Sequence, residues 1–363
     1  MTQLNEFLEG KLADLARNLV DQERARIIIP AQQESTGFWF GGGNMIEDDD
    51  GRFHVVGRYR NYGDSRTGVG AGDRGLELAI FRSDDRGQTF EKTLSLSKAD
   101  LNIDDRPVLS IEGSALRWTD DGVELFVSTE KDNIGYPPHL AGYLKPGTGV
   151  WTIERLCAHS IEGLKGAKIE TVLETKDPRV LHIKDPFVYG NKLLFCTHPF
   201  SWSSSNTGYA VCNPNGEVDA PVFDFFPRGM TWDVAMTRGT AVIDVPRVGA
   251  FSELNTSLVF YDGGESLRNM DEHATAVKRP RGYSCEELGG VAYIVDGDLN
   301  NIHRLSRELP MFISPHGTGC SRYVDVMAGH DGLYATWQQS QADLSQPLVL
   351  NHVSSERVAE ILS

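Results

Sequence analysis

The feature that most constrains the fold of this chain is a hairpin-like unit that recurs five times with weak sequence identity. Each copy contains an acid or amide residue, an apolar stretch, a turn rich in Asp, Asn or Gly, and a second apolar stretch. Such a turn between two apolar stretches predicts a β-hairpin. The copies span residues 41–60, 111–131, 184–200, 232–249 and 321–340.

Most copies are followed by a second pair of β-prone stretches, as at residues 76–82 and 84–90. Four strands per unit, repeated every several tens of residues, are typical of a β-propeller. The alternatives are a long β-sandwich and a β-helix. We therefore predict an all-β fold, a five-bladed β-propeller in which the inner strands face one channel. These strands are expected to begin near residues 44, 112, 185, 233 and 325.

Helical patterns occur at the two ends of the chain. Leucines at spacings of three and four predict an amphipathic N-terminal helix from Leu4 to Arg24. We assign residues 1–26 to this helix, packed on the outside of the main domain, and residues 27–363 to a single propeller domain. The helix could instead pair with another subunit and form a homo-oligomer. Ser354 or Ser355 can cap a short C-terminal helix.

Composition excludes several classes of partner. The 363 residues carry a formal net charge of −16, which disfavours nucleic acid. Apolar runs stay well short of the ~20 residues that span a bilayer, and the charged stretch 1–26 does not resemble a signal peptide. The five cysteines are scattered without a CxxC pair. We therefore expect a cytoplasmic protein with reduced thiols, no membrane association, no metal and no cofactor.

The segment Ser83–Phe90, with the sequence SDDRGQTF, resembles the Asp-box of sialidases and related propellers. In such a turn the Ser and Asp side chains bind backbone amides, and Gly adopts a positive φ. The motif is structural, so it supports the fold and not an activity.

Two further segments resemble the five-bladed glycoside hydrolases of the arabinanase and β-xylosidase type and their β-fructosidase relatives. Ile111-Glu112-Gly113, followed by Leu125–Ser128, resembles the strand that carries the general acid of that group. Lys184–Val188 resembles its Asp-Pro strand. The resemblance covers the repeats over residues 37–350 and implies an enzyme that hydrolyses O-glycosyl bonds. The order differs, because Asn44 stands where the group has Asp and Glu112 precedes Asp185.

Acidic residues near the starts of the repeats are the candidate catalytic groups. Inner strands of a propeller begin near its axis, so their first side chains converge. Glycoside cleavage needs one protonated carboxyl and one ionised carboxylate, and crowding of carboxylates raises at least one pKa. Alternatively, these side chains only bind turn amides. The candidates are Glu112, Asp185, Asp233 and Asp325.

We assign Glu112 as the general acid, because Ile111 and Leu116 are expected to surround it with apolar groups that favour the protonated form. We assign Asp185 as the ionised partner, because Lys184 can favour its charge. Asp233 or Asp325 would tune or position this pair.

Arginines and tryptophans are the candidate substrate-binding groups. Arg58, Arg60 and Arg66 could bind an acidic sugar or phosphate, and tryptophan rings can stack on the C–H face of a sugar. Tyr283 with Glu286 or Glu287 could form a tyrosine–glutamate pair of the sialidase kind. The predicted substrate-binding residues are Asn44, Arg58, Arg60, Trp202 and Trp232.

Three functions therefore compete. The carboxylates favour a glycoside hydrolase with a small-molecule carbohydrate substrate. The arginines favour a sialidase-like hydrolase or lyase that acts on acidic sugars. The third is a propeller that binds glycans without catalysis. A propeller hosts many functions, so only the site can decide among them.

Overall fold

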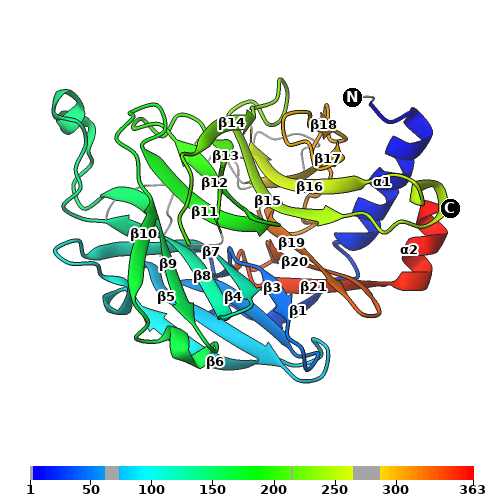
Figure 1. Cartoon of the computed structure of the whole chain (residues 1–363), viewed down its shortest axis with the longest axis horizontal. Coiled ribbons are helices and arrows are strands. Elements are labelled where there is room, and N and C mark those ends of the chain that lie inside the picture. Colours follow the sequence, from blue (N-terminus) through cyan, green and yellow to red (C-terminus); the bar gives the residue numbers. More distant parts are fainter. Residues whose placement is uncertain (1–2, 62–72, 214–215, 265–286) are drawn as a thin grey trace.

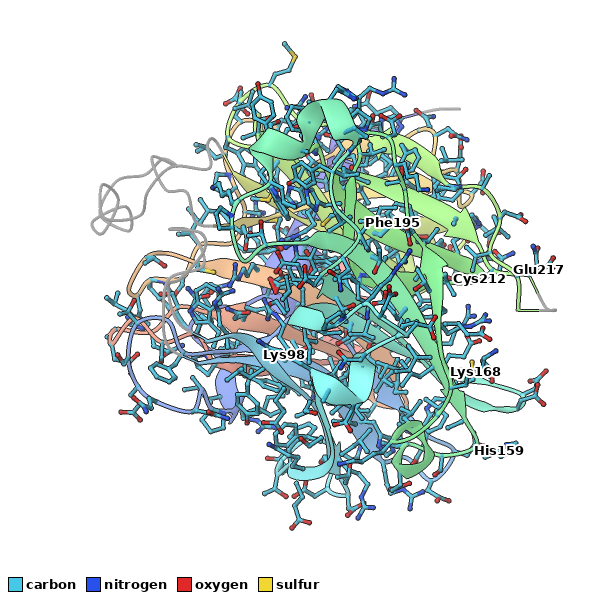
Figure 2. All side chains as sticks on the ribbon, turned by 90° about the vertical axis from the view of Figure 1, so that its left-hand side faces the viewer. Lys98, His159, Lys168, Phe195, Cys212 and Glu217 are labelled. Atoms are coloured by element: carbon cyan, nitrogen blue, oxygen red, sulfur yellow. The ribbon has the colours of Figure 1, made fainter. Side chains whose placement is uncertain are left out.

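The computed structural model describes residues 3–61, 73–213, 216–264 and 287–363. Within these residues the strands form five antiparallel sheets that follow one another around a central channel (Figure 1). The predicted five-bladed propeller with a helix at each end is confirmed. Apolar clusters fill the spaces between sheets: Phe195 is fully buried, whereas Lys168 and His159 lie at the periphery (Figure 2). No helix in the described part of the chain is both long and apolar enough to span a membrane.

In blades I to IV the strands run from the channel outward in chain order, whereas the outermost strand of blade V comes from the start of the chain. Blade I contains β2 (Trp39–Gly41), β3 (Met45–Glu47), β4 (Phe53–Asn61), β5 (Asp73–Ser83) and β6 (Glu91–Ser97). Blade II contains β7 (Val108–Thr119), β8 (Gly122–Lys131), β9 (Val150–Ala158) and β10 (Ile169–Leu173). Blade III contains β11 (His182–Tyr189), β12 (Lys192–His198), β13 (Asn206–Val211) and β14 (Val222–Phe226). Blade IV contains β15 (Met236–Asp244), β16 (Thr256–Gly264), β17 (Leu288–Val295) and β18 (His303–Arg304). Blade V contains β19 (Ser321–Gly329), β20 (Gly332–Gln339), β21 (Leu348–Ser354) and β1 (Arg26–Ile29).

Blade V is completed by the first strand of the chain. β1 pairs with β21 in an antiparallel ladder that places Arg26 opposite Leu350. The start of the chain therefore finishes the blade that its end builds, and this pairing closes the ring of blades.

The N-terminal helix α1 (Glu6–Leu19) is shorter than predicted. The Asn5 side chain caps it by accepting the Leu8 amide. After the helix, the Asp21 carboxylate accepts the amides of Glu23 and Arg24, and this local turn replaces the predicted last helical turn. The apolar stripe, which includes Leu12, Leu15 and Leu19, is buried against blades IV and V and against the C-terminal helix α2 (Ser355–Leu362).

The fourth predicted hairpin, residues 232–249, is wrong. This segment forms the single strand β15, and its partner β16 begins only at Thr256. Gly239, in the middle of this segment, lies at a bulge inside β15 and not in a turn. A Cβ there would lie 2.8 Å from the Phe187 ring, so the glycine permits close packing against blade III.

Every inner strand from β7 onward is bulged at a comparable level. The pairing with the second strand shifts between Ile111 and Ser114, Lys184 and Phe187, Gly239 and Ala241, and Arg322 and Asp325. In blade I the break between β2 and β3 takes the same place. A bulge re-aims side chains, so the bulges decide which residues face the channel.

Backbone amides at or beside the bulges bind the neighbouring blade all the way round. We call these five hydrogen bonds the interblade ring. They run from Ser114 N to Gly42 O (2.8 Å), Asp185 N to Ser128 Oγ (3.1 Å), Gly239 N to Thr207 Oγ1 (2.8 Å), Tyr323 N to Asp262 Oδ1 (3.0 Å) and Met45 N to Asp325 Oδ2 (2.8 Å).

The turn between β5 and β6 has hydrogen bonds of the kind expected for Ser83–Phe90. Ser83 Oγ accepts the Gly87 amide at 2.7 Å, and the Asp85 carboxylate accepts the Thr89 amide and hydroxyl at 2.8 and 2.6 Å. Arg86 extends from this turn to Asp331 of blade V, 2.6 Å away. The turn thus adds a contact across the closure between blades I and V. Its relation to the Asp-box of sialidases stays a prediction.

Candidate functional site

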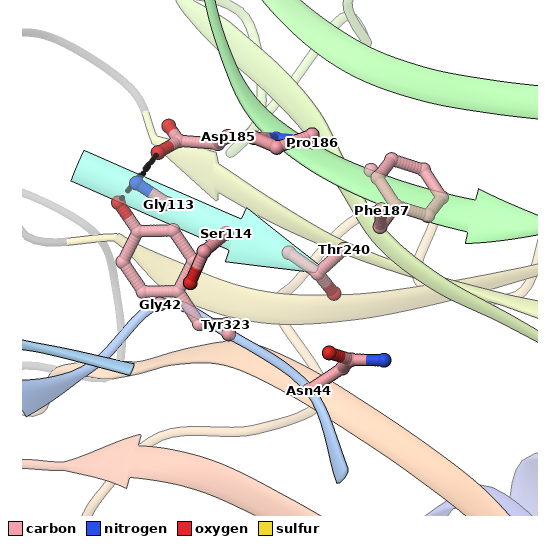
Figure 3. A pocket seen from close by; sticks show the side chains of 11 residues that line it. Gly42, Asn44, Gly113, Ser114, Asp185, Pro186, Phe187, Thr240 and Tyr323 are labelled. Atoms are coloured by element: carbon pink, nitrogen blue, oxygen red, sulfur yellow. Dashed lines mark hydrogen bonds between the residues drawn. The ribbon is translucent and has the colours of Figure 1, made fainter. Parts of the chain in front are cut away.

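Two of the predicted carboxylates, Glu112 and Asp185, meet where the bulges of β7 and β11 face each other. The Gly113 amide donates to Asp185 Oδ1 at 3.0 Å (Figure 3). A Cβ at Gly113 would lie 2.6 Å from that oxygen, so glycine is required for this approach. Lys184 Nζ lies 3.7 Å from both Glu112 Oε1 and Asp185 Oδ2. Glu112 Oε1 and Asp185 Oδ2 are therefore separated by no more than twice 3.7 Å.

Glu112 is surrounded by cations. Arg58 Nη2 lies 3.2 Å from Oε1, and Arg58 Nε lies 3.4 Å from Oε2. Burial alone would raise the pKa of Glu112, but the charges of Arg58 and Lys184 outweigh burial and hold this pKa well below its ordinary range. The predicted apolar setting is wrong, because Ile111 and Leu116 belong to the cluster between blades I and II.

Asp185 and Tyr323 share an unusual backbone conformation. Both have a φ of 53°, which is uncommon for residues other than glycine and costs conformational energy. The Tyr323 hydroxyl lies 3.5 Å from Asp185 Oδ1 (Figure 3). Arg238 Nη1 lies 3.2 Å from Asp185 Oδ2, and the Cys196 thiol donates to the same oxygen at 3.3 Å. Asp185 is thus fixed from several blades.

Three arginines converge on Tyr323. The guanidinium carbons of Arg58, Arg238 and Arg322 lie 5.3, 4.4 and 5.2 Å from the centroid of its ring. Sequence reasoning identified Arg58 and missed the other two. Arg238 and Arg322 stand at the bulges of β15 and β19, as Glu112 and Asp185 stand at those of β7 and β11. Alignment of the repeats on the bulge rather than on an acidic residue would have found them.

Each described cation of this cluster has a carboxylate partner. Arg238 binds Asp262 at 2.7 Å and Glu287 at 3.0 Å, and Arg322 also binds Glu287. Burial of charges is tolerated when they are paired in this way. We call this set the charged cluster; it comprises Arg58, Glu112, Lys184, Asp185, Arg238, Asp262, Glu287 and Arg322.

Asp233 and Asp325 lie apart from Glu112 and Asp185. Asp233 precedes β15 and is buried within blade IV, where Arg304 Nε lies at 2.8 Å and the Tyr261 hydroxyl at 3.3 Å. Asp325 lines a second cavity of about 320 Å³ further along the channel. Burial raises the pKa of Asp325 to about 7. The bulge in β19 explains why Asp325 lies apart from Asp185, because it places Tyr323 and not Asp325 beside Asp185.

Two predicted substrate-binding residues are engaged within the fold. The Asn44 amide accepts the Leu116 N–H at 2.7 Å and donates to the Leu116 carbonyl at 2.9 Å, so it joins blades I and II. Trp232 is buried, its ring lies 5.5 Å from that of Tyr261, and its indole N–H donates to the Ser306 carbonyl. The Trp232 ring is therefore packed inside blade IV, whereas Asn44 also lines both cavities of the channel.

The other predicted binding residues lie near the charged cluster. Arg60 stacks on Trp39 at 4.9 Å, and its charge adds to those that lower the pKa of Glu112. Trp202 is half-buried in the loop after β12, with its ring 4.1 Å from His182 and 4.7 Å from His198. Arg66, Tyr283 and Glu286 lie outside the described residues.

The cavity beside the charged cluster is narrow. Its volume is about 20 Å³, room for roughly one water molecule. Its lining begins at the bulges and includes Gly113, Asp185, Thr240 and Tyr323 (Figure 3). A sugar ring is too large for it, so substrate would have to approach Glu112 and Lys184 from the strand starts.

Among residues 3–61, 73–213, 216–264 and 287–363, no three or more His, Cys, Asp or Glu side chains are grouped to hold a metal ion. Cys157, Cys196 and Cys212 are free thiols, and Cys285 lies outside these ranges.

No family model and no curated protein matches this sequence. Solved structures match its fold over most of its length. An α-L-arabinofuranosidase from Lactobacillus brevis has a TM-score of 0.57 at 9% identity, covering 93% of each chain. A family-43 subfamily-1 enzyme from Xanthomonas citri, solved with xylose, has a TM-score of 0.54 at 10% identity and covers 95% of this chain and 92% of its own. A thermostable family-43 glycoside hydrolase has a TM-score of 0.55 at 11% identity and covers 87% and 89%. The chain therefore has the propeller fold found in these glycoside hydrolases.

Proposed function

We propose that this chain is a glycoside hydrolase that uses Glu112 and Asp185 as its reacting carboxylates. The observation that supports this proposal most directly is their meeting at adjacent bulges, with Lys184 within 3.7 Å of both. Hydrolysis of a glycoside requires two carboxyl groups on either side of the scissile bond. The likeness of the fold to glycoside hydrolases agrees with this assignment.

In this mechanism Glu112 donates a proton to the leaving oxygen, and Asp185 acts as the ionised partner. Glu112 is ionised in the free protein, so it must gain its proton in the complex. A sugar whose hydroxyl groups draw Lys184 or Arg58 away from Glu112 would raise the pKa of this carboxyl and supply the acid. Asp185 keeps Arg238 and the Gly113 amide as donors, which support its charge.

A second candidate function is a sialidase-like hydrolase that acts on acidic sugars. The convergence of Arg58, Arg238 and Arg322 on Tyr323 favours it, because arginine binds carboxylates in bidentate geometry. Tyr323 would then attack the sugar. Burial raises the pKa of Tyr323 well above its ordinary value, which disfavours the phenolate. The carboxylates that already pair with the arginines also weaken this candidate.

Chromogenic glycosides can test both candidates. We would assay 4-nitrophenyl arabinofuranoside and xyloside as neutral substrates and the 4-methylumbelliferyl glycosides of glucuronic and N-acetylneuraminic acid as acidic ones. Asp185→Asn should lower kcat/KM at least ~100-fold on any substrate that is cleaved. Glu112→Gln should retain more activity, because a good leaving group departs with little protonation. Asp84→Asn, at an exposed surface carboxylate, serves as the control.

Wild-type rates for both Glu112→Gln and Asp185→Asn would overturn the assignment. Cleavage of acidic substrates alone, abolished by Tyr323→Phe and retained by Glu112→Gln, would establish the second candidate instead. Binding of glycans without turnover would point to a propeller that only binds.

A further inference from the structure

We propose that the rim of blades II and III carries a platform of aromatic rings that binds additional sugar residues, so that the substrate is a carbohydrate chain. The inference rests on the proposed function for the position of the cleaved bond. The aromatic platform comprises Tyr136, Tyr143, Phe200 and Trp202, which come from the loops after β8 and β12.

The rings of the aromatic platform follow one another without a break. Their centroids are 5.4 Å apart between Tyr143 and Phe200, and 6.5 Å apart between Phe200 and Tyr136. His182 joins them to Trp202, because its ring lies 5.6 Å from Tyr136 and 4.1 Å from Trp202. Each ring therefore supports the next.

The inner end of the aromatic platform reaches the charged cluster. Lys184 Nζ lies 5.8 Å from the centroid of the Trp202 ring. The same ammonium group lies 3.7 Å from Glu112 and from Asp185. A sugar held between the two carboxylates would thus have its neighbouring sugar units near Trp202, and more distant ones nearer Phe200 and Tyr143.

The outer end of the aromatic platform is exposed and yet held in place. Tyr143 is 66% exposed. The fold does not require a large aromatic ring to be exposed in this way. The Tyr136 hydroxyl donates to the Phe200 carbonyl at 3.1 Å and also contacts His182 Nε2 at 3.0 Å. Pro137 and Pro138 stiffen the short 3-10 helix (Pro138–Tyr143) that carries Tyr143. The rings are therefore positioned before any ligand arrives, which lowers the entropic cost of binding.

The surroundings of the aromatic platform fit a carbohydrate. Exposed hydroxyl groups of Ser201 and Ser203 alternate with the rings of Phe200 and Trp202 along the same loop. A sugar presents both a C–H face, which packs on an aromatic ring, and hydroxyl groups, which bind polar neighbours. The two serine hydroxyls already bind each other at 3.0 Å, and an apolar partner would leave their remaining hydrogen-bonding capacity unsatisfied.

The test compares long and short substrates. We would measure kcat/KM for arabino- and xylo-oligosaccharides of two to five units and divide it by kcat/KM for the matching 4-nitrophenyl glycoside. In the wild-type protein this ratio should rise with chain length. Tyr143→Ala and Phe200→Ala should lower the ratio for the longer chains by about 3- to 10-fold, the effect of one lost aromatic contact. Phe7→Ala removes an equally exposed ring from α1, 59% exposed, and should leave the ratio unchanged.

Failure of the aromatic platform can be told apart from failure of the proposed function. If the aryl glycosides are cleaved but the ratio does not depend on chain length or on Tyr143, the platform is wrong and the hydrolase stands. If no aryl glycoside is cleaved, the platform is tested by electrophoresis in gels that contain arabinan, xylan or polygalacturonate. Slower migration of the wild-type and Phe7→Ala proteins than of Tyr143→Ala would support it, and equal migration of all three would overturn it.

Discussion

At the scale of single residues, Lys184 is, after Arg58, one of the cations that lower the pKa of Glu112. Its ammonium group lies within 3.7 Å of two carboxylates. Burial alone would lower the pKa of Lys184, but the charges of Asp185 and Glu112 outweigh burial and raise this pKa. Any change at Lys184 should therefore be seen in the pH dependence of the reaction, not only in its rate.

We expect Lys184→Gln to shift the alkaline limb of kcat/KM to higher pH by about one unit. Removal of a cation 3.7 Å from Glu112 raises the pKa of this carboxyl, so its acidic form persists to higher pH. Rates measured from pH 3 to 8 on an oligosaccharide that the protein cleaves, whose leaving group needs the proton, would show this. Lys168→Gln, at an exposed lysine that binds Glu170, should leave the profile in place. A shift toward lower pH would contradict the assignment of Glu112 as the acid.

Asp325 offers a second titration, which concerns stability. Its pKa is about 7 in the folded protein and near 3.9 in an unfolded chain. The ionised carboxylate therefore costs no stability below about pH 4, an increasing amount between pH 4 and 7, and its full cost above pH 7. Asp325→Asn retains an acceptor for the Met45 amide.

This variant should raise the free energy of unfolding by about 1 to 3 kcal/mol at pH 8 and change it little at pH 4. Urea denaturation at the two pH values provides the measurement. An equal change at both values would mean that the charge of Asp325 is not the cause.

At the scale of secondary-structure elements, the bulges separate what could be predicted from what could not. Hairpin turns such as Asp121-Gly122 and Asp331-Gly332 are local signals, so four of the five predicted hairpins form. A bulge adds a residue to one strand, and the side chains beyond it change face. Its position depends on contacts with other blades, as Gly239 against Phe187 illustrates. Sequence alone could therefore predict that Glu112 and Asp185 lie close together, but not that Asp233 and Asp325 lie apart from them.

The N-terminal helix provides a prediction at this scale. Deletion of residues 1–24 removes Leu12, Leu15 and Leu19 from a cluster shared with blades IV and V and with α2, so the Tm should fall. Deletion of residues 1–30 also removes β1 and leaves β21 with an unpaired edge, so this variant should lose solubility as well. Thermal unfolding followed by circular dichroism would distinguish the two. An unchanged Tm after the shorter deletion would mean that α1 contributes nothing to stability.

At the scale of the whole molecule, the interblade ring and its neighbouring contacts hold five sheets in one closed assembly. The hydrogen bonds pass from each blade to the next close to the channel. The residues of the candidate site, among them Asp185 and Tyr323, donate some of these bonds. The geometry of the site and the closure of the propeller therefore depend on the same backbone groups.

Asn44 tests this dependence, because its amide makes two hydrogen bonds from blade I to the backbone of Leu116 in blade II. Asn44→Ala leaves both backbone groups without this partner and should lower the free energy of unfolding by about 1 to 3 kcal/mol. Asn18→Ala, at a half-buried position where the side-chain amide donates to the Asp14 carbonyl of the same helix, should stay within about 0.5 kcal/mol of the wild-type value in the same urea titration. Similar values for both variants would show that the contact between blades I and II is unimportant for stability.

The pairing of β1 with β21 has a consequence for the order of events during synthesis. β1 leaves the ribosome long before β21 exists, and Ile27, Ile28 and Ile29 must wait without a partner while four blades are made. Such an apolar, β-prone segment promotes aggregation while it is exposed. The charged residues from Asp21 to Arg26 directly precede it and oppose association with other nascent chains. β1 can therefore dock only after β21 has been made, and a chain that ends before β21 cannot close the propeller through this pairing.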